Sequence, residues 1–180
     1  MGGLWGSFAN VCIYRIPQEK GVVAGRSYCP QCEIKISWYD NIPIFSYLFI
    51  QGKCRNCKKQ ISIQYLIVEL LSIISFGVVY FFYGITFTTL WLIILALTFI
   101  IIFFIDLKHY IIPNSLTFPL MFLGFIKSFD PNLNELFPNY INSLIGGVFG
   151  YGIIWAIIFL YKVLRNKEGM GLGDAKLLSA

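Results

Sequence analysis

The sequence has little charge and almost no histidine. Only 13% of its 180 residues are charged, against about 25% in soluble domains, so an ordinary water-soluble domain is excluded. The single histidine, His109, excludes a zinc-protease HExxH site, and without a serine elbow motif a serine protease built on His109 has little support. The net charge of +5 is too small and too localised to indicate a nucleic acid partner.

Long apolar runs take the place of charge. Hydrophobic residues make up 57% of the chain and aromatic residues 18%. A membrane-spanning helix needs about 20 apolar residues, and the sequence predicts an all-α polytopic membrane protein. At its start no basic residue precedes the apolar stretch and no cleavage site follows it, so we expect no cleavable signal peptide. The expected spans are 1–16, which is short, 66–84, 86–105, 115–129, also short, and 140–164.

Residues 17–64 form a basic, polar segment that holds four of the five cysteines. Two CxxC pairs can bring four thiolates to one tetrahedral zinc ion. A segment this short has little hydrophobic core, so it needs a bound metal or a similar cross-link to fold. We therefore predict a zinc-ribbon-like loop domain with structural zinc. Iron in a rubredoxin-like site and redox chemistry are the alternatives. The predicted ligands are Cys29, Cys32, Cys54 and Cys57.

Between the cysteine pairs lies the aromatic stretch ISWYDNIPIFSYLFIQGK, which suits packing either on the zinc domain or at the membrane interface. In the first apolar stretch, Gly2, Gly6 and Ala9 suit close helix contact, and Asn10 predicts a hydrogen bond between helices. Glu69, one turn inside the next span, either reaches the interface as a helix-start carboxylate or lines a polar cavity.

Two carboxylates are the candidate catalytic groups. Asp106 ends an apolar run, and Asp174 follows the glycines of GMGLGDAK. The positive-inside rule places residues 17–64 in the cytoplasm, and counting spans from there puts both acids at the cytoplasmic face. If the carboxylates meet in a wet recess they share a proton, so that one acts as general base on water while the other polarises the scissile carbonyl.

Several motifs occur in one order: GSFANVCIYRIP, CPQC, WYDNIP, GKCRNC, ISIQYLIVE, Asp106 ahead of IP, and GMGLGDAKLL. Together they cover nearly the whole chain, which resembles the type IV prepilin peptidase family of GxGD intramembrane aspartic proteases. The resemblance implies Asp106 and Asp174 as catalytic acids, Gly171 and Gly173 as the GxGD glycines, and the four cysteines as zinc ligands.

The resemblance also implies two reactions in the cytoplasmic (inner) membrane. The enzyme would remove the leader of prepilins or pseudopilins at the cytoplasmic face. It would then methylate the new N-terminus with S-adenosylmethionine. Gly52, Lys53 and Glu69 are weak candidates for the methyl transfer. The implied partners are the prepilin leader with its N-terminal helix, and the lipid bilayer.

The division expected from the sequence is a first transmembrane helix (1–16), a four-cysteine zinc-binding loop domain (17–64) and a peptidase core (65–180). The chain stops at Ala180, soon after Asp174, whereas family members continue. We therefore expect a fragment or an incomplete gene product with impaired folding or activity. The alternative functions are a zinc-stapled membrane scaffold, a carboxylate-lined ion carrier, or a peptidase that has lost methyl transfer.

Overall fold

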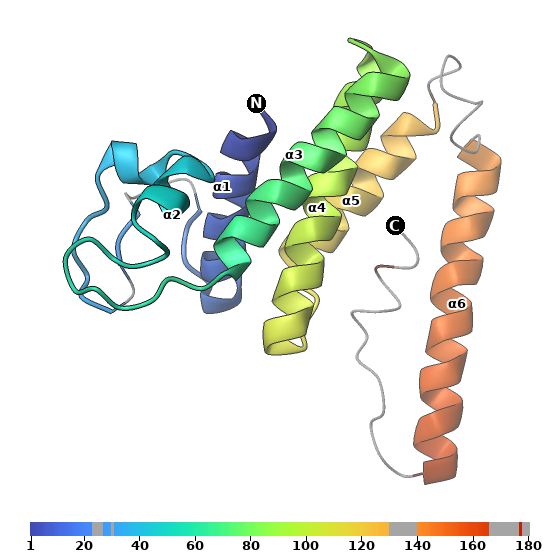
Figure 1. The fold of residues 1–180 in the computed structure, drawn as a ribbon. Helices are drawn as coiled ribbons and strands as arrows, with labels where there is room; N and C mark the ends of the chain where they lie inside the picture. Colours follow the sequence, from blue (N-terminus) through green and yellow to red (C-terminus); the bar gives the residue numbers. More distant parts are fainter. Residues whose placement is uncertain (23–26, 30, 130–139, 166–176, 178–180) are drawn as a thin grey trace. The chain divides into compact units, whose positions relative to one another are not determined.

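The computed structural model describes residues 1–22, 27–29, 31–129, 140–165 and 177, and within these ranges the fold is helical (Figure 1). Two isolated bridges occur there, Tyr28 with Lys35 and Lys53 with Gln60, but no named strand. The elements are α1 (Gly2–Arg15), η1 (Ile16–Gln18), η2 (Trp38–Asn41), α2 (Phe45–Phe49), α3 (Gln64–Tyr83), α4 (Phe87–His109), α5 (Asn114–Lys127) and α6 (Tyr140–Arg165).

The chain forms two compact units, Met1–Ile105 and Asp106–Ala180. The first holds α1, α2, α3 and most of α4, together with the cysteine loop. In the described part of the second, α5 contacts α6, and the ring of Phe129 stacks on Tyr140 at 5.5 Å.

Among the residues that the structure describes, three helices are long and apolar enough to cross a membrane: Gln64–Tyr83, Phe87–His109 and Tyr140–Tyr161. The prediction of a helical polytopic membrane protein is therefore confirmed. α1 and α5 have 14 residues each, which gives about 21 Å of helix, short of the roughly 30 Å hydrocarbon core.

The third apolar helix extends one turn beyond the predicted span. α4 continues through His109, so Asp106 lies inside the helix and not beyond it. No glycine or proline interrupts this turn, and the N–H of Tyr110 donates to the Asp106 carbonyl at 2.8 Å. The helix ends at Tyr110, where φ is 54°.

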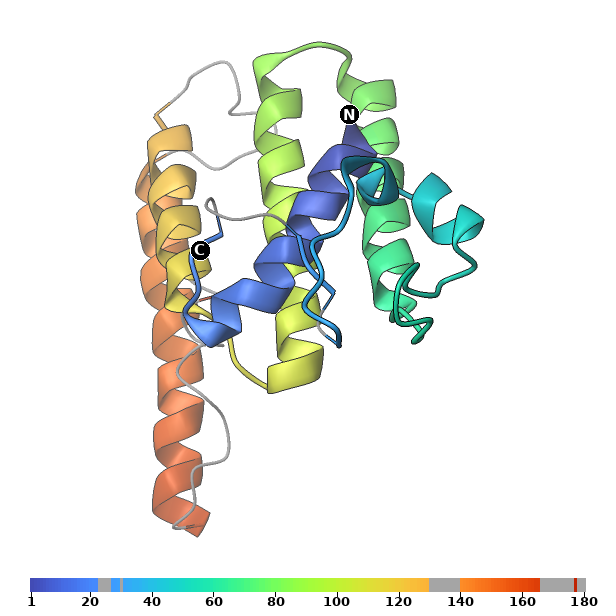
Figure 2. The same ribbon diagram turned by 90° about the vertical axis from the view of Figure 1, so that its left-hand side faces the viewer.

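α1 packs tightly along α3, as both views show (Figures 1 and 2). A Cβ built on Gly6 would lie 2.8 Å from the Cα of Glu69, and one on Gly2 would lie 2.9 Å from the Cα of Ile73. The helices therefore approach closely because glycine has no side chain. This confirms the prediction of small-residue contact.

The same helix pair buries polar groups as well. Asn10 donates from Nδ2 to the carbonyl of Tyr65 at 3.0 Å, which confirms the predicted hydrogen bond between helices. Ser72 has no exposed surface and donates to the carbonyl of Val68 at 2.8 Å. These bonds leave the buried amide and hydroxyl satisfied in apolar surroundings.

Gly6→Ala should destabilise the α1–α3 pair by about 1–3 kcal/mol, because the added methyl meets backbone that cannot move aside. The measurement is thermal unfolding of the protein in detergent. Gly77→Ala in α3 is the matched control, since a Cβ there meets nothing within 4 Å. Equal melting temperatures for the two variants would contradict the close fit of α1 on α3.

Candidate functional site: a four-cysteine centre and the acid Asp106

Four cysteines converge in the loop between α1 and α3. Their sulfur atoms all lie within 4.8 Å of one another, and the Sγ atoms of Cys29 and Cys57 are 3.9 Å apart. No disulfide joins the cysteines of the described chain. The structure therefore brings together the four predicted ligands, Cys29, Cys32, Cys54 and Cys57.

Both CxxC turns have the same backbone hydrogen bonds. The N–H of Cys29 donates to Ile34 O at 3.0 Å, and Glu33 N–H donates back to Cys29 O at 2.9 Å. In the second turn, Cys54 N–H donates to Lys59 O and Lys58 N–H donates to Cys54 O, both at 2.9 Å. Each turn thus presents two sulfurs from one rigid backbone frame.

The residue after each pair has left-handed backbone, with φ of 57° at both Glu33 and Lys58. Neither is glycine, so each turn holds a conformation that costs roughly 1–2 kcal/mol for a residue with a Cβ. The repeated strain at equivalent places indicates that both turns are shaped by a common requirement, the convergence of the sulfurs.

The thiols of the cluster differ in proton affinity. The backbone N–H groups of Cys57 and Asn56 lower the pKa of Cys54 to about 7, because they stabilise the thiolate. The Lys59 N–H acts in the same direction on Cys57, but desolvation and the neighbouring thiols outweigh it and raise that pKa to about 11. Four adjacent thiolates repel one another unless a cation neutralises them.

The geometry fits a tetrahedral zinc ion. Zinc–sulfur bonds of about 2.3 Å place tetrahedral sulfurs about 3.8 Å apart, close to the 3.9 Å between Cys29 and Cys57. The four thiols supply a complete set of sulfur ligands, as structural zinc sites have. The cluster can therefore hold a metal ion with no position left for a substrate.

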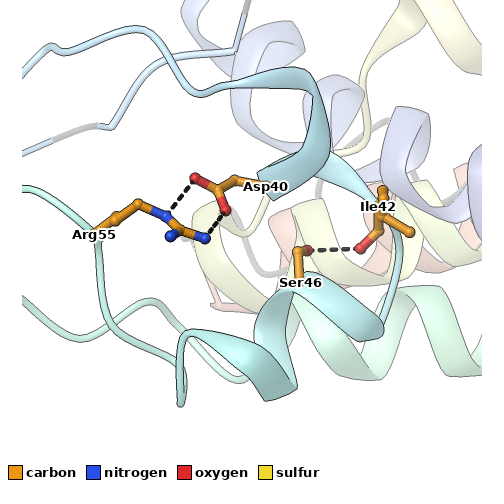
Figure 3. Close-up of polar contacts among 4 residues, drawn as sticks. All are labelled: Asp40, Ile42, Ser46 and Arg55. Carbon is orange, nitrogen blue, oxygen red and sulfur yellow. Dashed lines mark hydrogen bonds and ion pairs between the residues drawn. The ribbon is translucent and has the colours of Figure 1, made fainter.

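Contacts of the Arg55 side chain also stabilise this loop. Arg55 donates two hydrogen bonds to Asp40, at 2.7 and 3.0 Å (Figure 3), and its guanidinium lies 5.5 Å from the ring centroid of Tyr39. Asp40 belongs to the short helix η2, while Arg55 lies inside the second CxxC pair. The bidentate pair thus fixes the intervening aromatic stretch to the metal centre.

Gly52 occupies a position that favours glycine. Its φ is 64°, and an added Cβ would lie 2.9 Å from the phenol ring of Tyr47. Tyr47 in turn donates from its hydroxyl to the carbonyl of Ile61 at 3.3 Å. Next to it, Lys53 is exposed and its N–H donates to Ile50 O at 3.0 Å. Gly52 therefore has a structural role in closing the loop.

Glu69 fastens the loop to α3. It is buried on α3, and its Oε2 accepts a hydrogen bond from the backbone N–H of Ile44 at 2.8 Å. Ile44 has φ of 63°, which is a genuine outlier for a β-branched residue. Sequence reasoning missed this contact, because a strained backbone at Ile44 leaves no mark in the residue pattern.

The structure describes only one of the two candidate catalytic acids. Asp106 is exposed on the last turn of α4, next to Lys108 and His109. Asp174, with Gly171 and Gly173, lies outside the described residues. The meeting of the two carboxylates therefore stays a prediction.

The chain is similar to known proteins over its whole length. Residues 1–83 match the bacterial Peptidase A24 N-terminal domain, and residues 92–180 match the type IV leader peptidase family. A "Prepilin leader peptidase/N-methyltransferase" of Neisseria gonorrhoeae is 37% identical, over 100% of this chain and 70% of that protein. The chain belongs to the type IV leader peptidase family.

Other relatives in the leader peptidase family carry the same name. The protein of Vibrio cholerae is 38% identical over 97% of this chain and 71% of its own length. That of Pseudomonas aeruginosa is 34% identical over 99% of this chain and 68% of its own. No solved structure matches the chain.

Proposed function

We propose that this protein is a membrane aspartic endopeptidase that removes the leader of type IV prepilins or pseudopilins and then methylates the new N-terminus. Membership of the leader peptidase family is the observation that carries the proposal. The aspartic mechanism rests on Asp106 and Asp174, with Gly171 and Gly173 giving the backbone room beside the second acid.

The helix bounds support a common side for Asp106 and the cysteine centre. α3 leaves the cysteine loop, the chain reverses at Gly84, and α4 returns to Asp106. Two successive crossings bring the chain back to the face from which it started. The basic loop favours the cytoplasm for that face, and we propose the inner membrane as the location.

We propose that the leader is removed at this face. One carboxylate activates a water molecule and the other, protonated, hydrogen-bonds the scissile carbonyl. Cleavage is followed by transfer of a methyl group from S-adenosylmethionine to the exposed amine, which releases S-adenosylhomocysteine and a proton. Both steps require the pilin N-terminus to stay at the membrane surface, where its apolar helix enters the bilayer.

Methyl transfer is proposed to depend on the cysteine loop. Gly52, Lys53 and Glu69 remain the candidates, and the contacts of Gly52 and Glu69 make both of them shape the loop. A zinc ion held by the four cysteines would supply a fixed fold to this region, with no part in the chemistry. We retain the division into a first helix (1–16), a loop domain (17–64) and a peptidase core (65–180).

The test is a cleavage assay of the protein in detergent with a purified prepilin and S-adenosylmethionine. Mass spectrometry should show loss of the leader and then addition of one methyl group to the new N-terminus. Without S-adenosylmethionine only the first change is expected, and without the enzyme neither is.

Other outcomes separate the competing functions. A protein that holds zinc and melts cooperatively but leaves the prepilin intact would support the zinc-stapled scaffold or the ion carrier. Cleavage without methylation would identify a peptidase that lacks methyl transfer.

A further inference from the structure

The contacts of α2 fix its depth along the membrane-spanning helices. A Cβ built on Gly3 would lie 3.0 Å from Pro43 Cβ and 3.4 Å from Ile73 Cδ1, so these residues lie together. Ile44, just before α2, is hydrogen-bonded to Glu69. Counted from Gln64, where α3 begins, Glu69 is about 7.5 Å and Ile73 about 13.5 Å along the helix axis.

α2 therefore starts beside the interior of α3, within the thickness of one leaflet. Tyr47, in the middle of α2, donates to the carbonyl of Ile61, which precedes α3, so α2 also lies close to the start of that helix. A depth of about 5–10 Å below the headgroups is typical of interfacial helices.

The outer face of α2 is apolar and uncovered within the described first unit. Phe45 is 63% exposed, Leu48 61% and Phe49 84%. Residues 42–51 carry no charge. α1, which packs beside this segment, also exposes apolar side chains at Leu4 and Trp5, and these would meet lipid as well.

The backbone N–H groups of this segment are also hydrogen-bonded within the protein, as an apolar medium requires. The N–H groups of Ser46, Leu48 and Ile50 donate to the carbonyls of Ile42, Ile44 and Ser46. Those of Gln51, Gly52 and Lys53 likewise donate within the segment. The Ser46 hydroxyl donates to Ile42 O at 2.6 Å (Figure 3).

Glu69 completes this pattern. The N–H of Ile44 has no backbone acceptor among the described contacts, and the carboxylate of Glu69 supplies one. The buried Glu69 carboxylate thus supplies the hydrogen-bond acceptor that the Ile44 N–H needs in apolar surroundings. In a loop exposed to water, a water molecule would accept this hydrogen bond.

Charge returns directly after the apolar segment. The exposed cations of the second CxxC region are Lys53, Arg55, Lys58 and Lys59. Cations at this place would lie at the headgroups and attract anionic lipids.

We infer that α2 is embedded in the lipid leaflet next to the cysteine loop, with Phe45, Leu48 and Phe49 among the acyl chains. The loop is then not a wholly water-exposed domain. Its first half dips beside α1 and α3, and its second half carries the metal centre at the surface. The inference goes beyond leader cleavage and methyl transfer and does not depend on either.

The test places the photoreactive residue p-benzoyl-phenylalanine at Phe49 in the protein, in nanodiscs of phosphatidylethanolamine and phosphatidylglycerol. After illumination, mass spectrometry measures lipid adducts. Phe81, 83% exposed on the spanning helix α3, is the lipid-facing reference, and Lys35, exposed on the first CxxC turn, is the aqueous control. The probe is aromatic and replaces an exposed ring, so folding should be kept, which retained zinc would verify.

The expected result is an adduct yield at Phe49 close to that at Phe81 and several-fold above that at Lys35. A yield equal to that at Lys35 would overturn the inference. So would adducts at Phe49 that are formed mainly with an added prepilin, or with another segment of the chain, in place of lipid.

Discussion

Asp106→Asn and Asp174→Asn are each expected to lower the rate of prepilin leader removal by at least about 10³-fold. An amide can neither accept the proton of the attacking water nor share a proton with a carboxylate. Loss of either acid therefore removes the coupled pair, and the two changes together should cost little more than one. Leader removal is measured by mass spectrometry at saturating prepilin.

Asp130→Asn is the matched control, because Asp130 directly follows the expected span 115–129, and the same count of spans places it on the opposite side of the membrane from the cysteine loop. It should cleave at the rate of the unchanged protein. Each catalytic variant should still methylate a pilin that has already lost its leader, which shows that the protein is folded. Cleavage that survives in one of the two variants would remove that residue from the catalytic role.

Cys54→Ser is expected to reduce bound zinc from one ion per chain to near zero and to make the loop sensitive to protease. Structural zinc in small Cys sites contributes about 10–16 kcal/mol of apparent binding free energy, which is folding free energy for the segment. Few other groups are buried among the described residues of the cysteine loop, and Cys29 alone of the four predicted ligands is buried. Zinc is measured by elemental analysis, and the loop by limited proteolysis.

Cys12→Ala is the control for the cysteine series. Cys12 is buried in α1 and is not part of the four-sulfur cluster. Its variant should keep one zinc ion per chain and an intact loop. Iron in place of zinc, or a Cys54→Ser protein that retains its metal, would show that the structural zinc assignment is wrong.

Methyl transfer should fail in the Cys54→Ser protein if it depends on the loop, whereas leader removal should be less affected. The two readouts therefore separate the roles proposed for the loop and for the acids. A parallel loss of both would indicate that the loop also holds the peptidase core in its working arrangement.

The membrane-spanning helices, the cysteine cluster and the family could be predicted from the sequence alone. Long apolar runs identify the spans because a bilayer core admits only helices or closed barrels. The spacing of the two CxxC pairs predicted the four cysteines that the structure brings together, because each pair can supply two sulfurs from one turn. The ordered motifs around Asp106 and GMGLGDAK predicted the family.

Only the tertiary structure shows how the cysteine loop packs against α1 and α3. The fit of Gly6 against Glu69, the left-handed Gly52 under Tyr47, and the bond from Ile44 to Glu69 all depend on how separate segments are placed. No local pattern records the relative placement of elements. From the sequence alone, Glu69 is a functional candidate because it is a carboxylate in a membrane span. The tertiary structure shows that it also has a structural role, because it accepts a hydrogen bond from the strained backbone N–H of Ile44 in the loop that packs on α3.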